Sequence, residues 1–536
     1  MIFAFLRIVG IVFYSVGILL SPLFNFFVDI KKRTLPKITS NLLNIPAIEL
    51  AKQIRTQEVV YFIEILEIKM YLNQQIKSEQ VVRAYIHRIK EVDPYLNAVV
   101  DDRFEEAIED AKKVDLICSK AKDKDELMSK YPLLGVPFTV KEACGLKGMS
   151  QVIGNHYRKG MRCQEDSEVV KRVKSKGAIP LLVSANPEFC LSWETTSVVH
   201  GRCYNPYNMV RTSGGSSGGE GALNGSGASV FGVASDLSGS IRFPALFNGI
   251  FGHKPTGTLI SIKGHFPCVR DPNFDKLLQI GPITRFAGDL PILMDIFAGE
   301  DAAKMPYSQV SELKDLNVFF CDHSWSFHHL PVHSDIRNSI SKALDHFRRN
   351  GSTVQRLDIK EFDDSIGITY ATLMTQERPP NALMDPKNPD KYVSPSKEML
   401  KFFLRQSDHS FPAIFFHFMY ELSENIPQSF LQHYLKEKKN MQDKLSLKLG
   451  TNGVLLYPTF HCPAFLHNTS AFQTMGTMYS GLFNMIGFPA THVPMGLNKN
   501  GLPIGFQVVA APFQDRLCFQ IAKELETSFG GWVPPS

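Results

Sequence analysis

The sequence predicts an α/β fold for the body of the chain. From Leu133 onward, short apolar runs alternate with amphipathic stretches of helical period, which is the pattern of a sheet covered by helices. The 536 residues are 44% hydrophobic and 21% charged, which is enough to bury a large core. The body contains no internal repeat and no low-complexity linker that would divide it.

The individual elements follow from apolar period and from helix start and stop signals. Ser78 is the expected N-cap of a helix that ends at Asp93-Pro94, and Gly177 closes a later one. The expected strands are residues 135–141, 178–184, 230–233, 318–321, 454–457, 492–495 and 506–510. The expected helices are residues 47–55, 78–93, 103–119, 166–176, 289–298, 334–350 and 515–529, with a solvated loop at 120–130.

The N-terminus predicts a membrane anchor, residues 1–34, ahead of a catalytic domain at residues 35–536. Residues 8–30 carry only one charge, Asp29, and about 20 apolar residues suffice to cross a bilayer core. A cleaved signal peptide has a shorter apolar stretch, and a buried helix is less expected at an extreme terminus. Arg7 precedes the span and Lys31-Lys32-Arg33 follows it, so the positive-inside rule places the body in the cytosol.

Composition excludes several functional classes. The net charge of +5 is small for this length, and no basic stripe with interleaved aromatics suggests a nucleic-acid partner. The nine cysteines lack CxxC spacing, and the histidines lack HExxH spacing, so neither a disulfide framework nor a metal site is expected.

Two segments allow more than one interpretation. Residues 60–75 are rich in large apolar side chains whose spacing suits a helix or a strand. Residues 411–420, FPAIFFHFMY, hold five Phe and Tyr side chains in ten positions. Core packing explains these aromatics. Alternatively, residues 395–440 form an apolar cap that touches a membrane or lines a hydrophobic entrance.

Two clusters of glycine and serine, at residues 214–219 and 236–240, flank the short strand at 230–233. Glycine lets the backbone approach a ligand closely, so two such turns can bring serines and N–H groups to one point. A flexible linker is the alternative, but the second cluster runs directly into an apolar segment. The phosphate-binding pattern GxxxxGK[ST] is absent, since Glu220 follows the glycines.

A serine nucleophile needs a group that accepts its proton. The letters GxSxG occur at 214–218, but the lead-in is a loop rather than the apolar strand of a nucleophile elbow. The other route uses a lysine that burial keeps neutral. Lys141 is the candidate, at the end of the apolar strand PFTVK, although a lone lysine usually extends to solvent.

Four segments together resemble the amidase signature family. They are GVPFTVKEA at 135–143, GGSSGGEGAL at 214–223, DLSGSIRFP at 236–244 and GFPATHVPMGLNKNGLPIGFQVVAAPF at 487–513. The resemblance spans roughly residues 40–530, with a signature core at about 131–300. Within this family, the chain most resembles the fatty-acid amide hydrolases, especially the second type found in animals. Three features carry this resemblance: GGSSGGEG, the N-terminal span and the ending FGGWVPP.

This resemblance implies a many-stranded mixed sheet with helices on both faces, and it implies site roles. Ser240 would be the nucleophile, Ser216 the bridging serine after a cis peptide bond, and Lys141 the terminal base and acid. The N–H groups of Leu237, Ser238, Gly239 and Ser240 would form the oxyanion hole. Cys190 and Ser216 would contact substrate, while Ser217, Asp236 and Arg242 would support the site.

The implied function is hydrolysis of fatty-acid amides without metal or cofactor, at a single-pass anchor in an endomembrane or lipid droplet. Homodimers occur in this branch, and membrane lipid is the other expected partner. An amidase or amidotransferase component for small polar amides and a silent lipid-binding protein are the alternatives. Two departures stand out: Ser238 replaces a common glycine, and residues 60–75 form an insertion, either a membrane-facing element or a mis-assigned exon.

Overall fold

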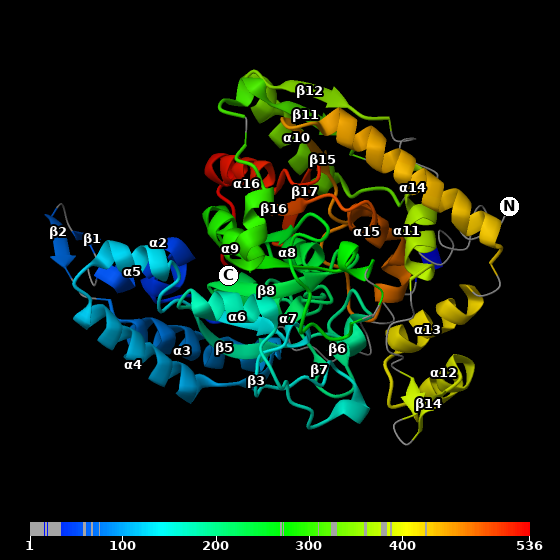
Figure 1. Ribbon diagram of the computed structural model, residues 1–536, viewed down its shortest axis with the longest axis horizontal. Coiled ribbons are helices and arrows are strands. Elements are labelled where there is room, and N and C mark those ends of the chain that lie inside the picture. Colours follow the sequence, from blue (N-terminus) through cyan, green and yellow to red (C-terminus); the bar gives the residue numbers. More distant parts are fainter. Residues whose placement is uncertain are drawn as a thin grey trace.

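An eleven-stranded mixed sheet runs through the body of the protein (Figure 1). The computed structural model describes residues 15–16, 19, 34–56, 60–65, 68–73, 76–268, 271, 273–308, 310–322, 330–358, 362–376, 383–385, 388–423 and 426–535. In sheet order the strands are β12 (Thr353–Arg356), β11 (Asn317–Phe320), β15 (Gly453–Tyr457), β17 (Pro503–Ala510), β16 (Ala490–Leu497), β9 (Phe251–Lys254), β10 (Gln279–Thr284), β8 (Phe231–Asp236), β4 (Pro137–Lys141), β5 (Ile179–Ser184) and β3 (Val99–Asp102). The expected α/β class with a large mixed sheet is therefore confirmed.

Strand direction changes along the sheet. β4 runs parallel to β5 and β8, and β11 runs parallel to β12 and β15. Between these two groups, β8, β10, β9, β16, β17 and β15 pair antiparallel in that order. Parallel strands need covered faces and long crossover connections, and the helices provide both.

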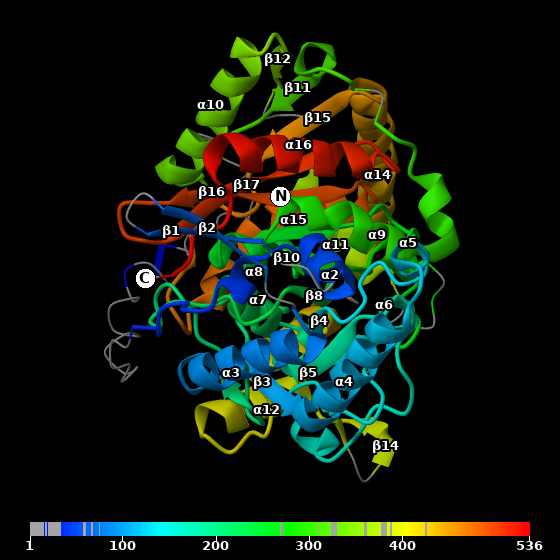
Figure 2. The same cartoon turned by 90° about the vertical axis from the view of Figure 1, so that its left-hand side faces the viewer.

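Helices cover both faces of the sheet (Figures 1 and 2). They are α2 (Ala47–Thr56), α3 (Ser78–Leu96), α4 (Phe104–Lys120), α5 (Lys124–Lys130), α6 (Glu168–Ser175), α7 (Gly218–Gly225), α8 (Arg242–Phe247), α9 (Leu290–Ala298), α10 (Ser334–Arg349), α11 (Ser365–Met374), α12 (Pro395–Phe403), α13 (Phe411–Ser423), α14 (Gln428–Leu449), α15 (Met478–Met485) and α16 (Asp515–Phe529). Side chains alternate along each strand, so Leu455 and Val509 join the core beneath α14 and α15, while Leu456 and Val508 join the core beneath α16.

Two local predictions at helix ends are wrong. Residues 120–130 are not all loop, because α5 forms there with Asp123 accepting from the N–H groups of Asp125 (2.8 Å) and Glu126 (3.0 Å). Ser78 is not an N-cap: Lys77 holds that position, and the Ser78 hydroxyl donates to the Gly135 carbonyl at 3.1 Å. The other expected strands and helices are present, with ends shifted by a few residues.

The segment at residues 60–75 forms the antiparallel hairpin of β1 (Val60–Ile65) and β2 (Ile68–Asn73), between α2 and α3. The choice between helix and strand is thereby decided in favour of strands. Whether this hairpin is an insertion relative to relatives stays a prediction.

The expected anchor at residues 1–34 lies outside the described residues, apart from 15, 16, 19 and 34. Within the part of the chain that is described, no helix is both long and apolar enough to cross a bilayer. The anchor therefore remains a prediction, as does the boundary between the two proposed domains.

Candidate active site

Lys141 ends β4 and points into the protein. Its side chain is fully buried, so the alternative in which it extends to solvent does not hold. Its Nζ donates to Ser216 Oγ at 2.6 Å and to Ser235 Oγ at 3.0 Å. The peptide bond between Gly215 and Ser216 is cis, as the family resemblance implies. A buried amine thus lies in direct contact with a serine hydroxyl.

Ser240 belongs to the loop that connects β8 to α8. Ser217 links this loop to the neighbouring residues Lys141, Ser216 and Ser235. The Ser217 N–H donates to the Ser240 carbonyl at 3.2 Å, and the Ser217 hydroxyl donates to the Ser235 carbonyl at 3.2 Å. Ser216 and Ser240 both line one cavity. The structure therefore gathers the three residues expected to react, Lys141, Ser216 and Ser240, in one place.

The cavity beside these serines encloses about 70 Å³ and is mostly apolar. Its lining comprises Phe189, Cys190, Leu191, Ser216, Ser235, Leu237, Ser240, His265, Pro267, Phe274, Leu278, Leu373, Gln376, Phe416 and Tyr420. Cys190 has the left-handed φ of 61°, within the turn that presents it to the cavity. Phe416 and Tyr420 come from α13, so the aromatic segment at 411–420 contributes both to packing and to the wall of this cavity.

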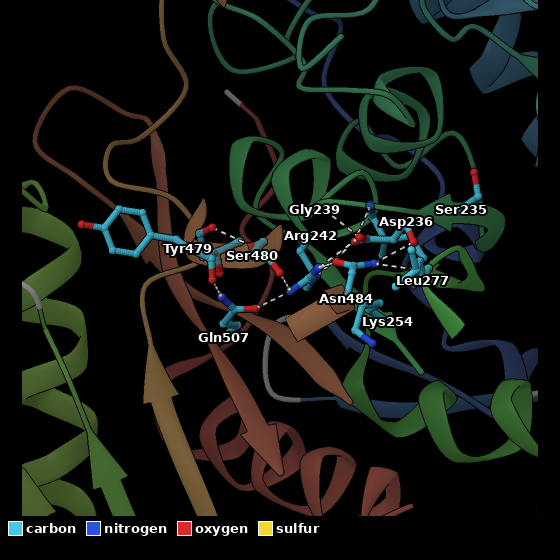
Figure 3. A network of polar contacts seen from close by, with 12 residues as sticks. Ser235, Asp236, Gly239, Arg242, Lys254, Leu277, Tyr479, Ser480, Asn484 and Gln507 are labelled. Atoms are coloured by element: carbon cyan, nitrogen blue, oxygen red, sulfur yellow. Dashed lines mark hydrogen bonds and ion pairs between the residues drawn. The ribbon is translucent and has the colours of Figure 1, made fainter. Parts of the chain in front are cut away.

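Asp236 and Arg242 form a buried ion pair at the base of the Ser240 loop, and Figure 3 shows Arg242 at the centre of its network. The Arg242 guanidinium donates to both Asp236 oxygens (3.0 and 3.1 Å), to Asn484 Oδ1 (2.6 Å) and to Gln507 Oε1 (2.8 Å). Burial alone raises the pKa of Asp236, but Arg242 and two backbone N–H groups outweigh it and lower that pKa to about 2. Asp236 is therefore a carboxylate, and its contacts with Arg242 and with the N–H groups of Gly239 and Ile241 hold the loop.

Two residues of the Ser240 loop, Leu237 and Ser240, line the cavity. The Gly239 N–H already donates to Asp236 Oδ1 at 2.6 Å, which leaves Leu237, Ser238 and Ser240 as the candidate oxyanion donors. Gly239 has φ 111°, and a Cβ there would lie 2.2 Å from the Phe243 ring, so only glycine fits. The Ser238 hydroxyl lies beside Gly481. A Cβ added to Gly481 would lie 2.5 Å from Ser238 Oγ.

Three polar residues around the site, Ser235, His265 and Glu220, were not among the site residues expected from the sequence. His265 Nε2 lies 2.9 Å from Ser235 Oγ, and Glu220 accepts from the Thr139 hydroxyl at 2.5 Å. Burial raises the pKa of Glu220 to about 7, despite the hydrogen bond from Thr139. Ser235 directly precedes the DLSGS cluster, and that position was the one available clue.

Chemically, this arrangement can perform acyl transfer. It holds a hydroxyl nucleophile, a second hydroxyl in contact with an amine, and backbone N–H groups beside an apolar cavity. Among the described residues, no group of three or more His, Cys, Asp and Glu side chains could hold a metal ion.

Comparison with known proteins agrees with this chemistry. The family model described as amidase matches residues 80–519. Fatty-acid amide hydrolase 2-A of Danio rerio is 37% identical over 509 residues, which cover 94% of this chain and 92% of that protein. Fatty-acid amide hydrolase 2 of Homo sapiens is 36% identical over 480 residues, covering 87% of this chain and 89% of that protein.

Solved structures share the fold at lower identity. A fatty acid amide hydrolase superposes with a TM-score of 0.71 at 19% identity, covering 92% of this chain and 87% of that one. A 6-aminohexanoate cyclic dimer hydrolase superposes with a TM-score of 0.70 at 21% identity, covering 93% and 99% of the two chains.

Proposed function

Because the chain belongs to the amidase signature family, whose members hydrolyse amide bonds, we propose that it is a serine hydrolase of fatty-acid amides. Its substrates are N-acylethanolamines and primary fatty amides, which it cleaves to a free fatty acid and an amine. The observation on which this proposal rests is the 2.6 Å contact of buried Lys141 with Ser216, beside the apolar cavity that also contains Ser240.

The reaction begins with proton transfer through two serines. Unprotonated Lys141 accepts the Ser216 proton while Ser216 accepts the proton of Ser240. The Ser240 oxygen then forms a bond to the substrate carbonyl carbon, and the carbonyl oxygen becomes an oxyanion. The N–H groups of Leu237, Ser238 and Ser240 stabilise that oxyanion, and each such donor typically contributes about 3 kcal/mol.

Collapse of the tetrahedral intermediate breaks the carbon–nitrogen bond. Lys141 returns its proton through Ser216 to the departing nitrogen, so the amine leaves neutral. Water then attacks the acyl-Ser240 ester, giving its proton back along the same path, and the fatty acid is released. Proton count and charge are restored at the end of the cycle.

The preference for lipid amides rests on two features. The cavity wall next to Ser240 is built from Leu191, Leu237, Leu373 and Phe416, which suit a hydrocarbon chain. The curated relatives that share over a third of their residues with this chain are called fatty-acid amide hydrolases.

We propose further that the protein works at a membrane. Residues 1–34 form a single-pass anchor in an endomembrane or lipid droplet, with the body in the cytosol. On α12 and directly after it, Leu400, Phe403 and Leu404 are 58–70% exposed, so residues 395–440 present apolar side chains suited to a lipid surface. Protease treatment of sealed microsomes tests the orientation: a fully protected body would contradict it.

The deciding experiment is hydrolysis of oleamide and of an N-acylethanolamine by the purified protein, with Ser240→Ala and Lys141→Ala in parallel. We expect a loss of at least about 100-fold in both variants, since each removes a member of the proton path. Activity that persists in Ser240→Ala contradicts the nucleophile assignment. Equal rates for short and long acyl amides would favour a small polar amide as substrate.

An inert protein is a separate outcome. If the intact chain hydrolyses neither amide and a fluorophosphonate probe fails to label Ser240, then the protein is a lipid-binding relative without catalytic activity. Labelling without amide turnover would keep the serine machinery and direct the search to esters or other amides.

A further inference from the structure

We propose that His265 is a positioning residue, which acts through Ser235 to keep the free electron pair of Lys141 directed at Ser216. The proposal deepens the proposed function and rests on it. Its basis is a continuous line of contacts: Pro267 carbonyl, His265, Ser235, Lys141 and Ser216.

The tautomer of His265 follows from its partners. Nδ1 lies 2.9 Å from the Pro267 carbonyl oxygen, which can only accept a hydrogen bond. Nδ1 therefore carries the ring hydrogen. In a neutral imidazole the other nitrogen, Nε2, is then an acceptor.

The hydroxyl of Ser235 is oriented in turn. Its oxygen lies 2.9 Å from His265 Nε2, which accepts, so the Ser235 O–H must donate to the ring. The lone pairs of this oxygen remain available to accept the Lys141 N–H at 3.0 Å. Cys144 also contacts Ser235, and burial raises the pKa of its thiol to about 12, so the thiol can donate but does not compete as a thiolate.

This direction matters for base catalysis. An unprotonated amine has two N–H groups and one lone pair. With Ser235 able only to accept, one N–H of Lys141 is bonded to Ser235. In the reacting form the lone pair of Nζ is then free to take up the proton of Ser216, whose Oγ lies 2.6 Å away. A Ser235 hydroxyl that was free to rotate could instead donate to Lys141 and occupy that lone pair.

His265 is suited to a fixed role. It is only 5% exposed. Burial lowers the pKa of its ring well below the usual value, so it stays neutral at physiological pH. The tautomer and the direction of the hydrogen bonds thus stay the same over the range in which an amidase works.

A double-mutant cycle tests the inference. We compare kcat and KM on oleamide for the intact protein, His265→Leu, Ser235→Ala and the two changes together. His265→Leu should lower kcat about 10- to 100-fold, because it impairs only part of a general-base contribution that is typically about 100- to 10,000-fold. In the Ser235→Ala background the same change should cost less than about twofold, because His265 acts only through the hydroxyl that is gone.

His265→Gln is the conservative control. A glutamine offers one acceptor and one donor and cannot be protonated, so it should keep kcat within about threefold of the intact protein. Most of the His265→Leu loss should appear in kcat and little of it in KM, since a lost substrate contact would chiefly raise KM. Circular dichroism and thermal unfolding check that each variant is folded.

The outcomes separate the two proposals. If the losses in kcat from His265→Leu and Ser235→Ala multiply in the double variant, or if His265→Leu changes only KM, the role of His265 is overturned. The proposed function survives this result as long as Lys141→Ala still abolishes activity. Activity that survives Lys141→Ala overturns both the lysine mechanism and this inference. If His265→Leu does not fold, the test uses His265→Gln alone. A loss of kcat in His265→Gln as large as the loss in Ser235→Ala would then contradict the proposal.

Discussion

The signature core at residues 131–300 and the cap segment at residues 395–440 meet at the same cavity but are built differently. The core holds a dense set of buried polar contacts, including the Lys141–Ser216 pair and the Asp236–Arg242 ion pair. The cap lines the cavity with the aromatic rings of Phe416 and Tyr420 and exposes apolar side chains on α12.

Under the proposed function, this difference separates the chemistry from substrate choice. Hydrogen bonds and ion pairs fix atoms at defined distances and directions, which proton transfer requires. Apolar contacts are less directional and depend on shape and area, which suits a flexible acyl chain. Changes in the core should therefore alter stability or kcat, whereas changes in the cap should alter the ratio of substrates.

The largest stability effect should come from breaking the buried ion pair. Arg242→Met should lower the free energy of unfolding by about 3–5 kcal/mol, because Asp236 would keep a buried charge without its partner. The matched control is Arg348→Met, whose pair with Asp345 is half exposed and should cost only about 0–1 kcal/mol. Urea denaturation measures both, and equal costs would refute this account of the core.

A pH effect of intermediate size should come from Glu220. Burial raises its pKa in the folded protein to about 7, above the unfolded value, so the folded state favours the protonated form. Its contribution to stability is thus complete below about pH 4 and is lost as pH rises through about 7, on the order of 2–3 kcal/mol.

Glu220→Gln removes this titration and keeps an uncharged side chain of similar shape. Unfolding in urea at pH 5 and pH 8 should show a smaller difference for Glu220→Gln than for the intact protein. An identical pH dependence in the two proteins would exclude Glu220 as its source.

The smallest effect should come from the cap and should depend on the substrate. Phe416→Ala should lower kcat/KM for a long-chain amide about tenfold, because lost apolar contacts cost about 1–3 kcal/mol, and should spare a short-chain amide. Phe403→Ala is the control, since that ring is 70% exposed on α12. The ratio of kcat/KM for oleamide and a short amide, measured in detergent, checks both. A parallel loss on both substrates would place Phe416 in the chemistry.

The sequence located the proposed reacting centre better than the residues that surround it. Lys141, Ser216 and Ser240 lie in short motifs whose glycines and apolar strands constrain the backbone, and all three meet in space. His265 could not be identified in this way, because it lies 30 positions from Ser235 along the chain and only the folded sheet brings them together.

Local patterns left one further segment undecided and were wrong about another. Residues 60–75 suited either helix or strand, and only pairing across the hairpin selects strands. The charged stretch at 120–130 resembled a loop, yet the cap at Asp123 starts a short helix there. The hydrogen bond from the Gly239 N–H to Asp236 likewise depends on how the side chains pack, and no sequence pattern indicates it.

The network around Arg242 also bears on the order of events during synthesis. The loop that presents Ser240 is held by Arg242, and Arg242 is held by Asn484 and Gln507, more than 240 positions later in the chain. Until both residues have been synthesised, the contacts of Arg242 with Asn484 and Gln507 cannot form. Under the proposed function, we therefore expect an unfinished chain to lack hydrolytic activity until β17, which carries Gln507, has been made.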